Sequence, residues 1–320
     1  MLLTIFLFVL GFALLIKGAD FLVDGASFLA KKLKISLIVI GLTVVAFGTS
    51  TPELVVNIFA SARGSSEIAI GNVLGSNIAN ILLILGLSAA IFPLLVKHNT
   101  VWKEVPLSVL AVLSLFVLAN DFLIDKISPS ILTRSEAIIL LFFFIIFLYY
   151  TFSIAKNNDE QDKSKIIEYS ISKSILRVIL GLAFLVLGGK WVVDGAIDFA
   201  RFFGVSETLI GLTIVAVGTS LPELATSTVA VFKKNSDIAV GNIVGSNIFN
   251  IFFVLGISGI IKPLSFNPAV NNFDIFVVLL ASLLLFCAMF LGKKYNLERW
   301  QGAGLLILYF VYIGYLIYRG

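Results

Sequence analysis

Two carboxylates lie within two nearly identical apolar stretches of the chain. The stretch GLTVVAFGTSTPEL at 41–54 contains Glu53, and the stretch GLTIVAVGTSLPEL at 211–224 contains Glu223. The two stretches are identical at 11 of 14 positions. A carboxylate in the middle of a membrane span is costly and indicates a functional site. Two such groups at matching positions predict a site that both stretches share.

The residues before each glutamate predict an interrupted helix. Pro52 lacks an N–H group and Gly48 relaxes the backbone, so the helix should break near the centre of its span. Pro52 also suits the first turn of a second half-helix, which Ser50 or Thr51 would cap. The second stretch repeats the pattern with Ala216, Gly218, Thr219, Ser220 and Pro222.

A second duplicated motif supplies further oxygen atoms. GNVLGSNIAN at 71–80 and GNIVGSNIFN at 241–250 match at 7 of 10 positions, with the same separation along the chain as the first pair of stretches. Ser76 and Asn80 are four residues apart and share a helical face, and so do Ser246 and Asn250. The glycines of this motif predict close packing between spans two and three, at Gly71 and Gly75, and between spans seven and eight, at Gly241 and Gly245. The remaining asparagines fit either helix contacts or ion ligands: Asn72, Asn77, Asn242 and Asn247.

The predicted ligands are all oxygen atoms. The helix break would free carbonyl groups near Ala46 and Thr49, which a cation could satisfy. Carboxylate, hydroxyl, amide and carbonyl oxygens suit Ca²⁺, Mg²⁺ or Na⁺, whereas the lack of Cys and His in the motifs disfavours zinc and copper. Two ionised carboxylates balance one Ca²⁺ or two monovalent cations. A site that holds either species, but not both, is the basis of exchange by alternating access.

The elements that position these residues are membrane spans. Of 320 residues, 59% are hydrophobic and 13% are charged, whereas about a quarter of the residues of a soluble domain are charged. The first span has no signal-peptide features, and we expect it to be retained. Because a spanning helix needs about 20 apolar residues, the sequence predicts ten spans, at 2–22, 36–60, 68–92, 103–120, 135–155, 173–195, 206–231, 238–261, 272–291 and 301–318.

The constant separation of the matching motifs divides the chain into two five-span repeats, 1–155 and 173–320, joined by a polar linker at 156–172. Since five is odd, the second repeat enters the membrane from the opposite side, and such inverted repeats place their sites near the midplane. Lys and Arg concentrate in the loops after the odd-numbered spans. The positive-inside rule then places the linker in the cytoplasm and both termini outside. The predicted fold class is an all-α multi-pass protein of the cell membrane.

These motifs resemble those of the sodium/calcium exchanger family of the cation/calcium antiporter superfamily. The resemblance rests on the paired G-T-S-x-P-E and G-N-x-x-G-S-N-I-x-N blocks and extends through the ten-span plan. It implies that Ca²⁺ and Na⁺ bind in turn at the membrane centre, while the first and sixth helices move as a gate. The implied roles are as follows: Glu53 and Glu223 are shared ligands, Thr49 and Thr219 give carbonyl and hydroxyl oxygens, Ala46 and Ala216 give carbonyls, Ser50, Ser76, Ser220 and Ser246 complete flanking Na⁺ sites, and Asn80 and Asn250 line the central site.

The coupling ion is predicted from one departure within this family. Some prokaryotic exchangers and the potassium-dependent branch carry Asp where this chain has Asn250. Here Asn80 and Asn250 both lack the charge, which resembles the potassium-independent branch. The proton-driven branch carries further acids in these motifs, and 71–80 and 241–250 have none. We therefore expect Na⁺ as the coupling ion, with H⁺ or K⁺ coupling as the alternative.

Several other classes of function fit less well. An anion transporter would need a basic residue beside the half-helices, and none accompanies the glutamates. A cation channel with a carboxylate ring remains an alternative. The sequence lacks a nucleophile–base pair and a catalytic metal motif, so no enzyme activity and no cofactor are expected. Cys287 is the one cysteine, which precludes an internal disulfide. The expected partners are Ca²⁺, Na⁺ and the lipid bilayer, without nucleic acid or an obligatory protein partner.

Overall fold

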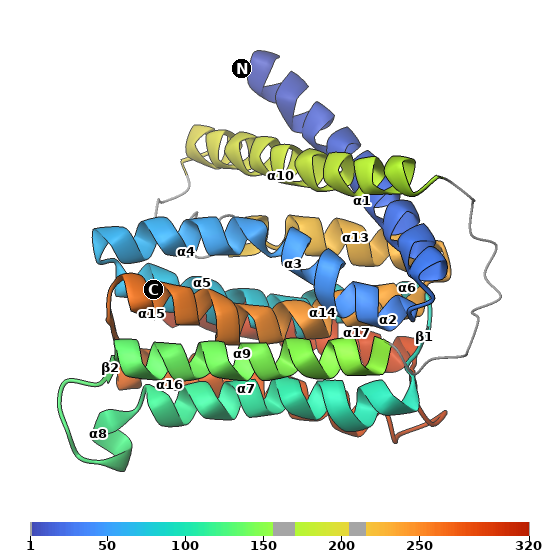
Figure 1. Cartoon of the computed structure of the whole chain (residues 1–320). Helices are drawn as coiled ribbons and strands as arrows, with labels where there is room; N and C mark the ends of the chain where they lie inside the picture. The colour runs from blue at the N-terminus through green and yellow to red at the C-terminus, as the bar shows by residue number, and fades with distance from the viewer. Residues whose placement is uncertain (1, 156–169, 205–215, 320) are drawn as a thin grey trace.

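The computed structural model describes residues 2–155, 170–204 and 216–319, which are mostly helical (Figure 1). Segments labelled η are π-helical. The elements of the first half are α1 (Leu2–Leu33), α2 (Leu37–Ile40), η1 (Gly41–Val45), α3 (Ala46–Thr49), α4 (Thr51–Arg63), α5 (Ser66–Ile78), η2 (Ala79–Leu85), α6 (Gly86–Ile91), β1 (Leu94–Leu95), η3 (Thr100–Glu104), α7 (Val105–Leu118), α8 (Asp121–Ile124), β2 (Ile131–Leu132) and α9 (Arg134–Ala155).

The second half repeats this order. Its described elements are α10 (Ile171–Phe202), α12 (Ala216–Gly218), α13 (Leu221–Phe232), α14 (Ser236–Ile248), η5 (Phe249–Val254), α15 (Leu255–Ile261), β3 (Leu264–Ser265), α16 (Pro268–Ala288), β4 (Asn296–Leu297) and α17 (Arg299–Arg319). In Figure 1, α9 ends and α10 begins at the right of the view, whereas α1 begins and α17 ends towards the left. We call the right-hand end of the bundle the linker end.

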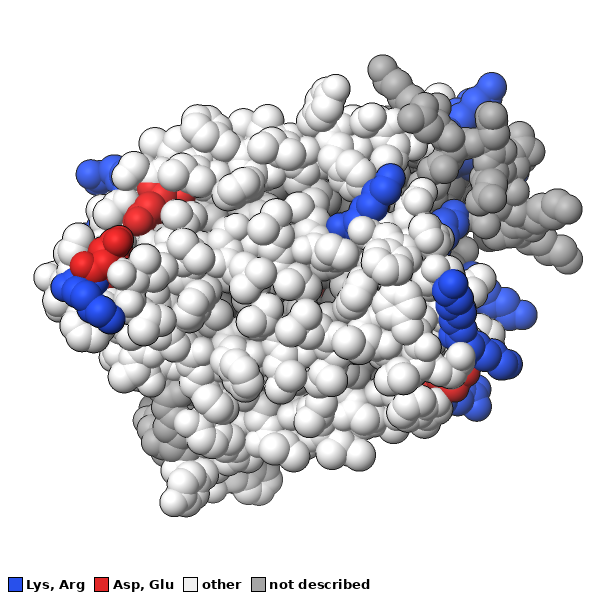
Figure 2. All heavy atoms as spheres, turned by 90° about the horizontal axis from the view of Figure 1, so that it is seen from below, with Lys and Arg blue, Asp and Glu red and all other residues white. Residues whose placement is uncertain are grey.

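The described residues contain most of the predicted spans. Eight helices are long and apolar enough to cross a membrane, and the bent pair Leu37–Thr49 and Thr51–Arg63 makes a ninth span. The seventh predicted span, 206–231, lies partly outside the described residues, and its described part contains α12 and α13. Figure 2 shows a broad, mostly uncharged face between two ends where most of the visible Lys, Arg, Asp and Glu gather. That distribution is the one expected of a protein that crosses a bilayer.

Two of the predicted spans are shorter than the observed helices. The prediction ended spans one and six at residues 22 and 195, but α1 continues to Leu33 and α10 to Phe202. The polar residue Asp24 therefore lies within α1 and not in a loop. There it forms ion pairs with Lys233 and Arg177. Paired charges allow the helix to continue past the apolar segment.

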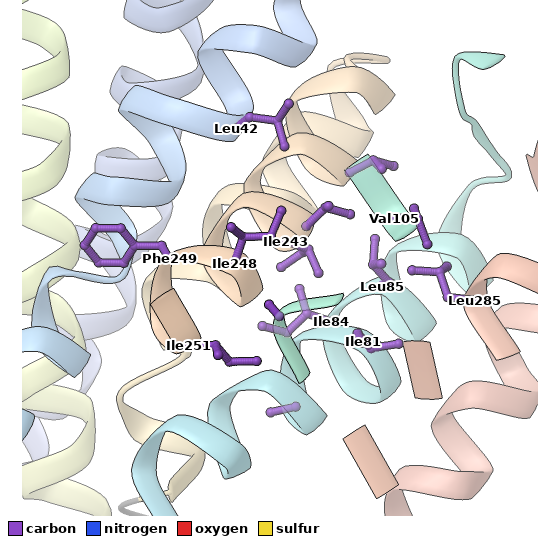
Figure 3. Close-up of a cluster of buried hydrophobic side chains, with 14 of the residues drawn as sticks. Leu42, Ile81, Ile84, Leu85, Val105, Ile243, Ile248, Phe249, Ile251 and Leu285 are labelled. Carbon is purple, nitrogen blue, oxygen red and sulfur yellow. The ribbon is translucent and has the colours of Figure 1, made fainter. Parts of the chain in front are cut away.

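The two most buried spans form the centre of the bundle. They are α5–η2–α6 and α14–η5–α15, in which 72% and 83% of the residues of the most apolar segment are buried, against 28% for both α1 and α10. Figure 3 shows side chains of these spans gathered between them, among them Ile84, Ile243 and Ile248. Each of these three is fully buried. Both copies of the second duplicated motif, 71–80 and 241–250, therefore lie on enclosed helices.

Helices α1 and α10 pack directly backbone to backbone, side by side on one flank of the bundle. A side-chain carbon added at Gly11 would lie 2.9 Å from the carbonyl oxygen of Gly188, and one at Gly18 would lie 2.8 Å from that of Gly181. At Gly25 the added carbon would lie 2.8 Å from the carbonyl oxygen of Ser174. These glycines recur every seven residues along one face of α1, so larger residues would separate the two helices.

The glycines of the second motif pack differently from the prediction. Added carbons at Gly241 and Gly245 would lie 2.9 and 2.7 Å from the carbonyl oxygens of Ile38 and Leu42. Their neighbour is therefore span two of the other repeat rather than span seven. Gly71 and Gly75 have no neighbour within 4 Å among the described residues. Spans seven and eight do pack against each other through α13 and α14, but the prediction is wrong in assigning Gly241 and Gly245 to that contact, because the repeats interleave around the bundle centre.

Two short antiparallel ladders connect the repeats at their ends. Strand β1 pairs with β4, with Leu94 opposite Leu297, and β2 pairs with β3, with Leu132 opposite Leu264. Each ladder joins one strand from the first repeat to one from the second. Since a two-residue ladder contributes few hydrogen bonds, its effect is to fix the loops that follow the central spans.

Candidate ion-binding site

The two helix breaks lie where the sequence predicts them. Helix α3 ends at Thr49, α4 begins at Thr51, and the two half-spans meet at 46°. Ser50 at the junction has φ −84° and ψ 9°, and Ser220 in the second repeat has the nearly identical values −87° and 6°. Pro52 lies in the first turn of α4. The proline and its neighbours thus produce the same backbone in both repeats.

The groups at the first break are used differently from the prediction. Ser50 precedes α4, but its hydroxyl does not cap that helix and instead donates to Glu223 Oε1 at 2.8 Å. The carbonyl of Ala46 is not free, because it accepts from the backbone N–H of Ser50 at 3.0 Å. The bend is modest enough that this helical hydrogen bond survives. Ala216 begins α12, but its side chain lies outside the described part of the chain.

Glu53 and Glu223 are completely buried, with 0% exposure. Glu53 Oε1 accepts from Ser76 and Ser220, each at 3.4 Å. Glu223 Oε1 accepts from Ser50 at 2.8 Å and from Ser246 at 3.5 Å. Each carboxylate is therefore held by one hydroxyl of its own repeat and one of the other repeat. Among the ion pairs of the described residues, none includes either glutamate.

Four asparagines cross-link the repeats beside the carboxylates. Asn80 Nδ2 donates to Asn247 Oδ1 at 2.9 Å, and Asn250 Nδ2 donates to Asn77 Oδ1 at 3.1 Å. Asn77 Nδ2 in turn donates to the carbonyl of Asn247 at 3.3 Å. Because the amide groups of Asn80 and Asn250 are both engaged, their oxygen atoms face away from these bonds. The sequence left open whether Asn77 and Asn247 are ligands or helix contacts, and here they hold the predicted ligands.

Four buried oxygen atoms of this cluster have no hydrogen-bond partner among the described residues. They are Oε2 of Glu53, Oε2 of Glu223, Oδ1 of Asn80 and Oδ1 of Asn250. Burying a polar group without a partner costs about 1–3 kcal/mol, and more for a charged group. The four atoms form two pairs related by the repeat. Two carboxylate oxygens and two amide oxygens are hard ligands of the kind that Ca²⁺ and Na⁺ prefer.

The hydroxyl groups of Thr49 and Thr219 each contact an asparagine of the other repeat. The Thr49 hydroxyl donates to Asn242 Oδ1 at 3.0 Å, and the Thr219 hydroxyl donates to Asn72 Oδ1 at 3.4 Å. Asn72 and Asn242 therefore join half-spans of opposite repeats. These contacts favour the structural alternative for the two asparagines.

Two residues of this outer network were not predicted. Asn72 Nδ2 donates to Asn57 Oδ1 at 2.7 Å, and Asn242 Nδ2 donates to Ser227 Oγ at 3.1 Å. Asn57 and Ser227 occupy matching positions of the two repeats and are polar residues within apolar half-spans. That match between the repeats is the sequence signal that would have found them.

A π-helical segment accompanies each of the two asparagines that the sequence predicts as ligands. Asn80 lies at the start of η2 and Asn250 at the start of η5. A π-helical segment displaces the residues of a helical face and is often found at functional sites. The same irregularity occurs at equivalent positions of the two most buried spans. The backbone as well as the side chains is thus arranged around the cluster.

Comparison with known proteins identifies close relatives over nearly the whole chain. The family model "Sodium/calcium exchanger protein" matches residues 3–153 and 173–318. The chain is 34% identical over 342 residues to the sodium/calcium exchanger MaX1 of Methanosarcina acetivorans, covering 97% of each chain. It is 40% identical over 293 residues to the inner membrane protein YrbG of Escherichia coli strain K12, covering 89% of this chain and 88% of that protein.

A solved structure has the same fold. The sodium-calcium exchanger NCX_Mj, in crystals soaked with 2.5 mM Na⁺ and 0.1 mM Ca²⁺, superposes with a TM-score of 0.82. The two sequences are 34% identical, and the match covers 98% of each chain.

Proposed function

Because this chain belongs to the sodium/calcium exchanger protein family, we propose that it exchanges Na⁺ for Ca²⁺ at the cluster around Glu53 and Glu223. The protein is a multi-pass membrane antiporter and not an enzyme, and the ions of its family are transported substrates rather than cofactors. The observation that carries the proposal is the set of four buried oxygen atoms without partners. A desolvated cation would satisfy all four at once.

The central position takes Ca²⁺ in this proposal. Ca²⁺ binds six to eight oxygen atoms, and the two glutamates and Asn80 and Asn250 offer four. The remaining ligands come from water or from backbone carbonyls at the breaks, those of Thr49 and Thr219 first. Ala46 and Ala216 stay in the proposed ligand set through their carbonyls, and at Ala46 the ion would replace the long 3.4 Å contact from the Thr49 hydroxyl.

The flanking positions take Na⁺. Each carboxylate Oε1 already faces two serine hydroxyls, Ser76 and Ser220 at Glu53 and Ser50 and Ser246 at Glu223. A Na⁺ ion beside either carboxylate would find hydroxyl and carboxylate oxygens together. Two Na⁺ ions at these positions would neutralise the carboxylates of Glu53 and Glu223. One central Ca²⁺ needs the same two carboxylates as ligands. Occupation by one species therefore excludes the other, which is the requirement for exchange.

The proposed coupling ion is Na⁺ rather than H⁺ or K⁺. Asn80 and Asn250 supply neutral amides where a carboxylate could add charge for a further cation. The described residues also lack a cluster of three or more His, Cys, Asp or Glu side chains. Only the two glutamates are therefore available at this site to carry protons. Na⁺ needs no protonatable group and fits the hydroxyl-rich flanks.

The proposed orientation places the linker end in the cytoplasm. Basic residues gather at that end in Figure 2, where α1 and α13 finish with Lys31, Lys32, Lys233 and Lys234. Cytoplasmic loops carry an excess of Lys and Arg.

The test is radiolabelled Ca²⁺ uptake into proteoliposomes. Vesicles loaded with Na⁺ are diluted into choline medium, and parallel vesicles carry an outward H⁺ or K⁺ gradient instead. We expect concentrative uptake with the Na⁺ gradient alone. Uptake driven only by H⁺ or K⁺ would show that Na⁺ is not the coupling ion, while the proposed site around Glu53 and Glu223 would stand. Passive uptake that never exceeds equilibrium would indicate a channel.

A further inference from the structure

The two ends of the bundle differ although the two repeats are related. Asp24 on α1 matches Asp194 on α10 in the repeat. Arg63 at the end of α4 matches Lys233, which follows α13. The repeat thus contains the same acid–base pair twice. Among the described residues, only the pair at the linker end is formed.

The formed pair connects three helices. Lys233 Nζ lies 2.6 Å from Asp24 Oδ1 and 2.5 Å from Asp20 Oδ1, and it also donates to the carbonyl of Asp20 at 3.2 Å. Arg177 of α10 lies 3.1 Å from Asp24 Oδ2. The side chain of Asp24 is only 18% exposed. Lys233 at the end of α13 is thereby fastened to α1, and α1 to α10.

The equivalent pair at the other end is open. Arg63 and Asp194 are both exposed, and among the described residues no ion pair includes either of them. The packing has the same asymmetry. Val23 and Ala26 beside Asp24 are fully buried, whereas their counterparts Val193 and Ala196 on α10 are only partly buried.

We propose that Asp24–Lys233 and Asp194–Arg63 are alternating latches of the two access states. The latch at the linker end is closed in the state seen here, and the latch at the opposite end closes when α1 and α10 move. The inference rests on the proposed exchange by alternating access. Inverted repeats exchange conformations between the two states, so the contact made by one pair becomes available to the other.

The energetics suit such an exchange. The closed latch is a cluster near the surface in which Lys233 contacts Asp20 and Asp24 and Arg177 contacts Asp24, and ion pairs near the surface are weak enough to break repeatedly. A state is favoured by a contact only to the extent that the other state lacks it. Both latches are ion pairs near the surface, so neither traps its state, although Lys190 stands at the opposite end where the linker end has Asp20. Loss of one latch should shift the population towards the state that the other one holds.

A cysteine reporter measures that population. Cys287, which is exposed on α16, is replaced by Ser, and Ser27→Cys places a thiol behind the linker-end latch. Ser27 is 4% exposed and accepts from Asn235 Nδ2 at 3.3 Å. The purified full chain in detergent, at fixed Na⁺ and Ca²⁺, reacts with a membrane-impermeant maleimide. The rate of labelling reports opening of the linker end.

The two latches predict changes of opposite sign. Lys233→Gln should raise the labelling rate at least about fivefold, because it removes the two weak ion pairs to Asp20 and Asp24. Arg63→Gln should lower the rate, because it removes the contact of the linker-open state. Lys233→Arg should keep the original rate, and Lys234→Gln on the neighbouring exposed residue is the matched control. Arg63 has no ion pair with the described residues in this state, so a purely local role predicts no effect of its removal.

Two results would overturn the latches. One is an unchanged rate in Lys233→Gln, and the other is an unchanged or raised rate in Arg63→Gln. Labelling needs no transport, so it separates this inference from the proposed function. If the labelling rates shift as predicted but the protein does not exchange Na⁺ for Ca²⁺, the latches are supported and the proposed ions are wrong. A protein that exchanges the ions with unchanged labelling has a different gate.

Discussion

At the scale of residues, the glutamate pair is the part of the site that the sequence defines best. Its cost in an apolar span and its repetition at matching positions identify Glu53 and Glu223 without a structure. The hydroxyl pattern could not be predicted in the same way. Ser50 bonds to Glu223 rather than capping its own helix, and the choice depends on how the repeats are placed against each other.

The first prediction concerns these carboxylates. Glu53→Gln and Glu223→Gln should each abolish Na⁺-driven Ca²⁺ uptake, because a neutral amide neither balances the cation nor gives two equivalent oxygens. The variants should fold, since an uncharged group is easier to bury than a carboxylate. Uptake in proteoliposomes and thermal unfolding in detergent measure the two effects. Near-normal uptake in either variant would remove that glutamate from the site.

The second prediction concerns Asn247 as a positioning residue. Asn247→Leu removes the acceptor of the Asn80 amide and frees that side chain to turn. We expect the half-saturating Ca²⁺ concentration to rise about tenfold, in line with the loss of one buried hydrogen bond, with little change in maximal rate. Asn247→Gln keeps an amide acceptor without adding charge and should retain most of the Ca²⁺ affinity. Equal losses in both variants would mean that the residue only fills space.

At the scale of elements, the sequence predicts the spans well and their irregularities poorly. Apolar length locates the helices within a few residues, and Pro52 locates the break. The π-helical segments at Asn80 and Asn250 had no sequence signal that we recognised, since they depend on packing around the centre. The length of α1 was underestimated because an ion pair between distant residues is invisible to a count of apolar residues.

The third prediction concerns the backbone contact between α1 and α10. Gly18→Val places a side-chain carbon about 2.8 Å from the carbonyl oxygen of Gly181, which forces the helices apart. Overpacking of this kind costs about 1–3 kcal/mol, so both the melting temperature and the uptake rate should fall. Gly314→Val on α17 is the control, because no neighbour lies within 4 Å of that position among the described residues. Similar behaviour of the two variants would argue against a tight pair.

At the scale of the whole molecule, the inverted repeat was predictable because five is odd and the separation between matching motifs is constant. The interleaving of the two repeats was not predictable. Sequence identity between the repeats does not show which repeat supplies the neighbours of a given helix. Gly241 and Gly245 contact span two rather than span seven for this reason.

The fourth prediction concerns charge movement by the complete transporter. If more than two Na⁺ leave for each Ca²⁺ that enters, each cycle carries net positive charge outwards. An inside-positive potential should then accelerate Ca²⁺ uptake into Na⁺-loaded vesicles, with about 2.3 kcal/mol per 100 mV for each net charge. The potential is set with a K⁺ gradient and valinomycin, and the same gradient without valinomycin is the control. An uptake rate that ignores the potential would indicate electroneutral exchange.

The two β-ladders constrain how the protein is made. Strands β1 and β2 are synthesised with the first repeat, but their partners β4 and β3 belong to the second. During translation the first five spans therefore enter the bilayer with two unpaired strand edges and without the helices that cover their motif. The nascent half must wait in the membrane, and its maturation ends only after the final loops have emerged from the ribosome.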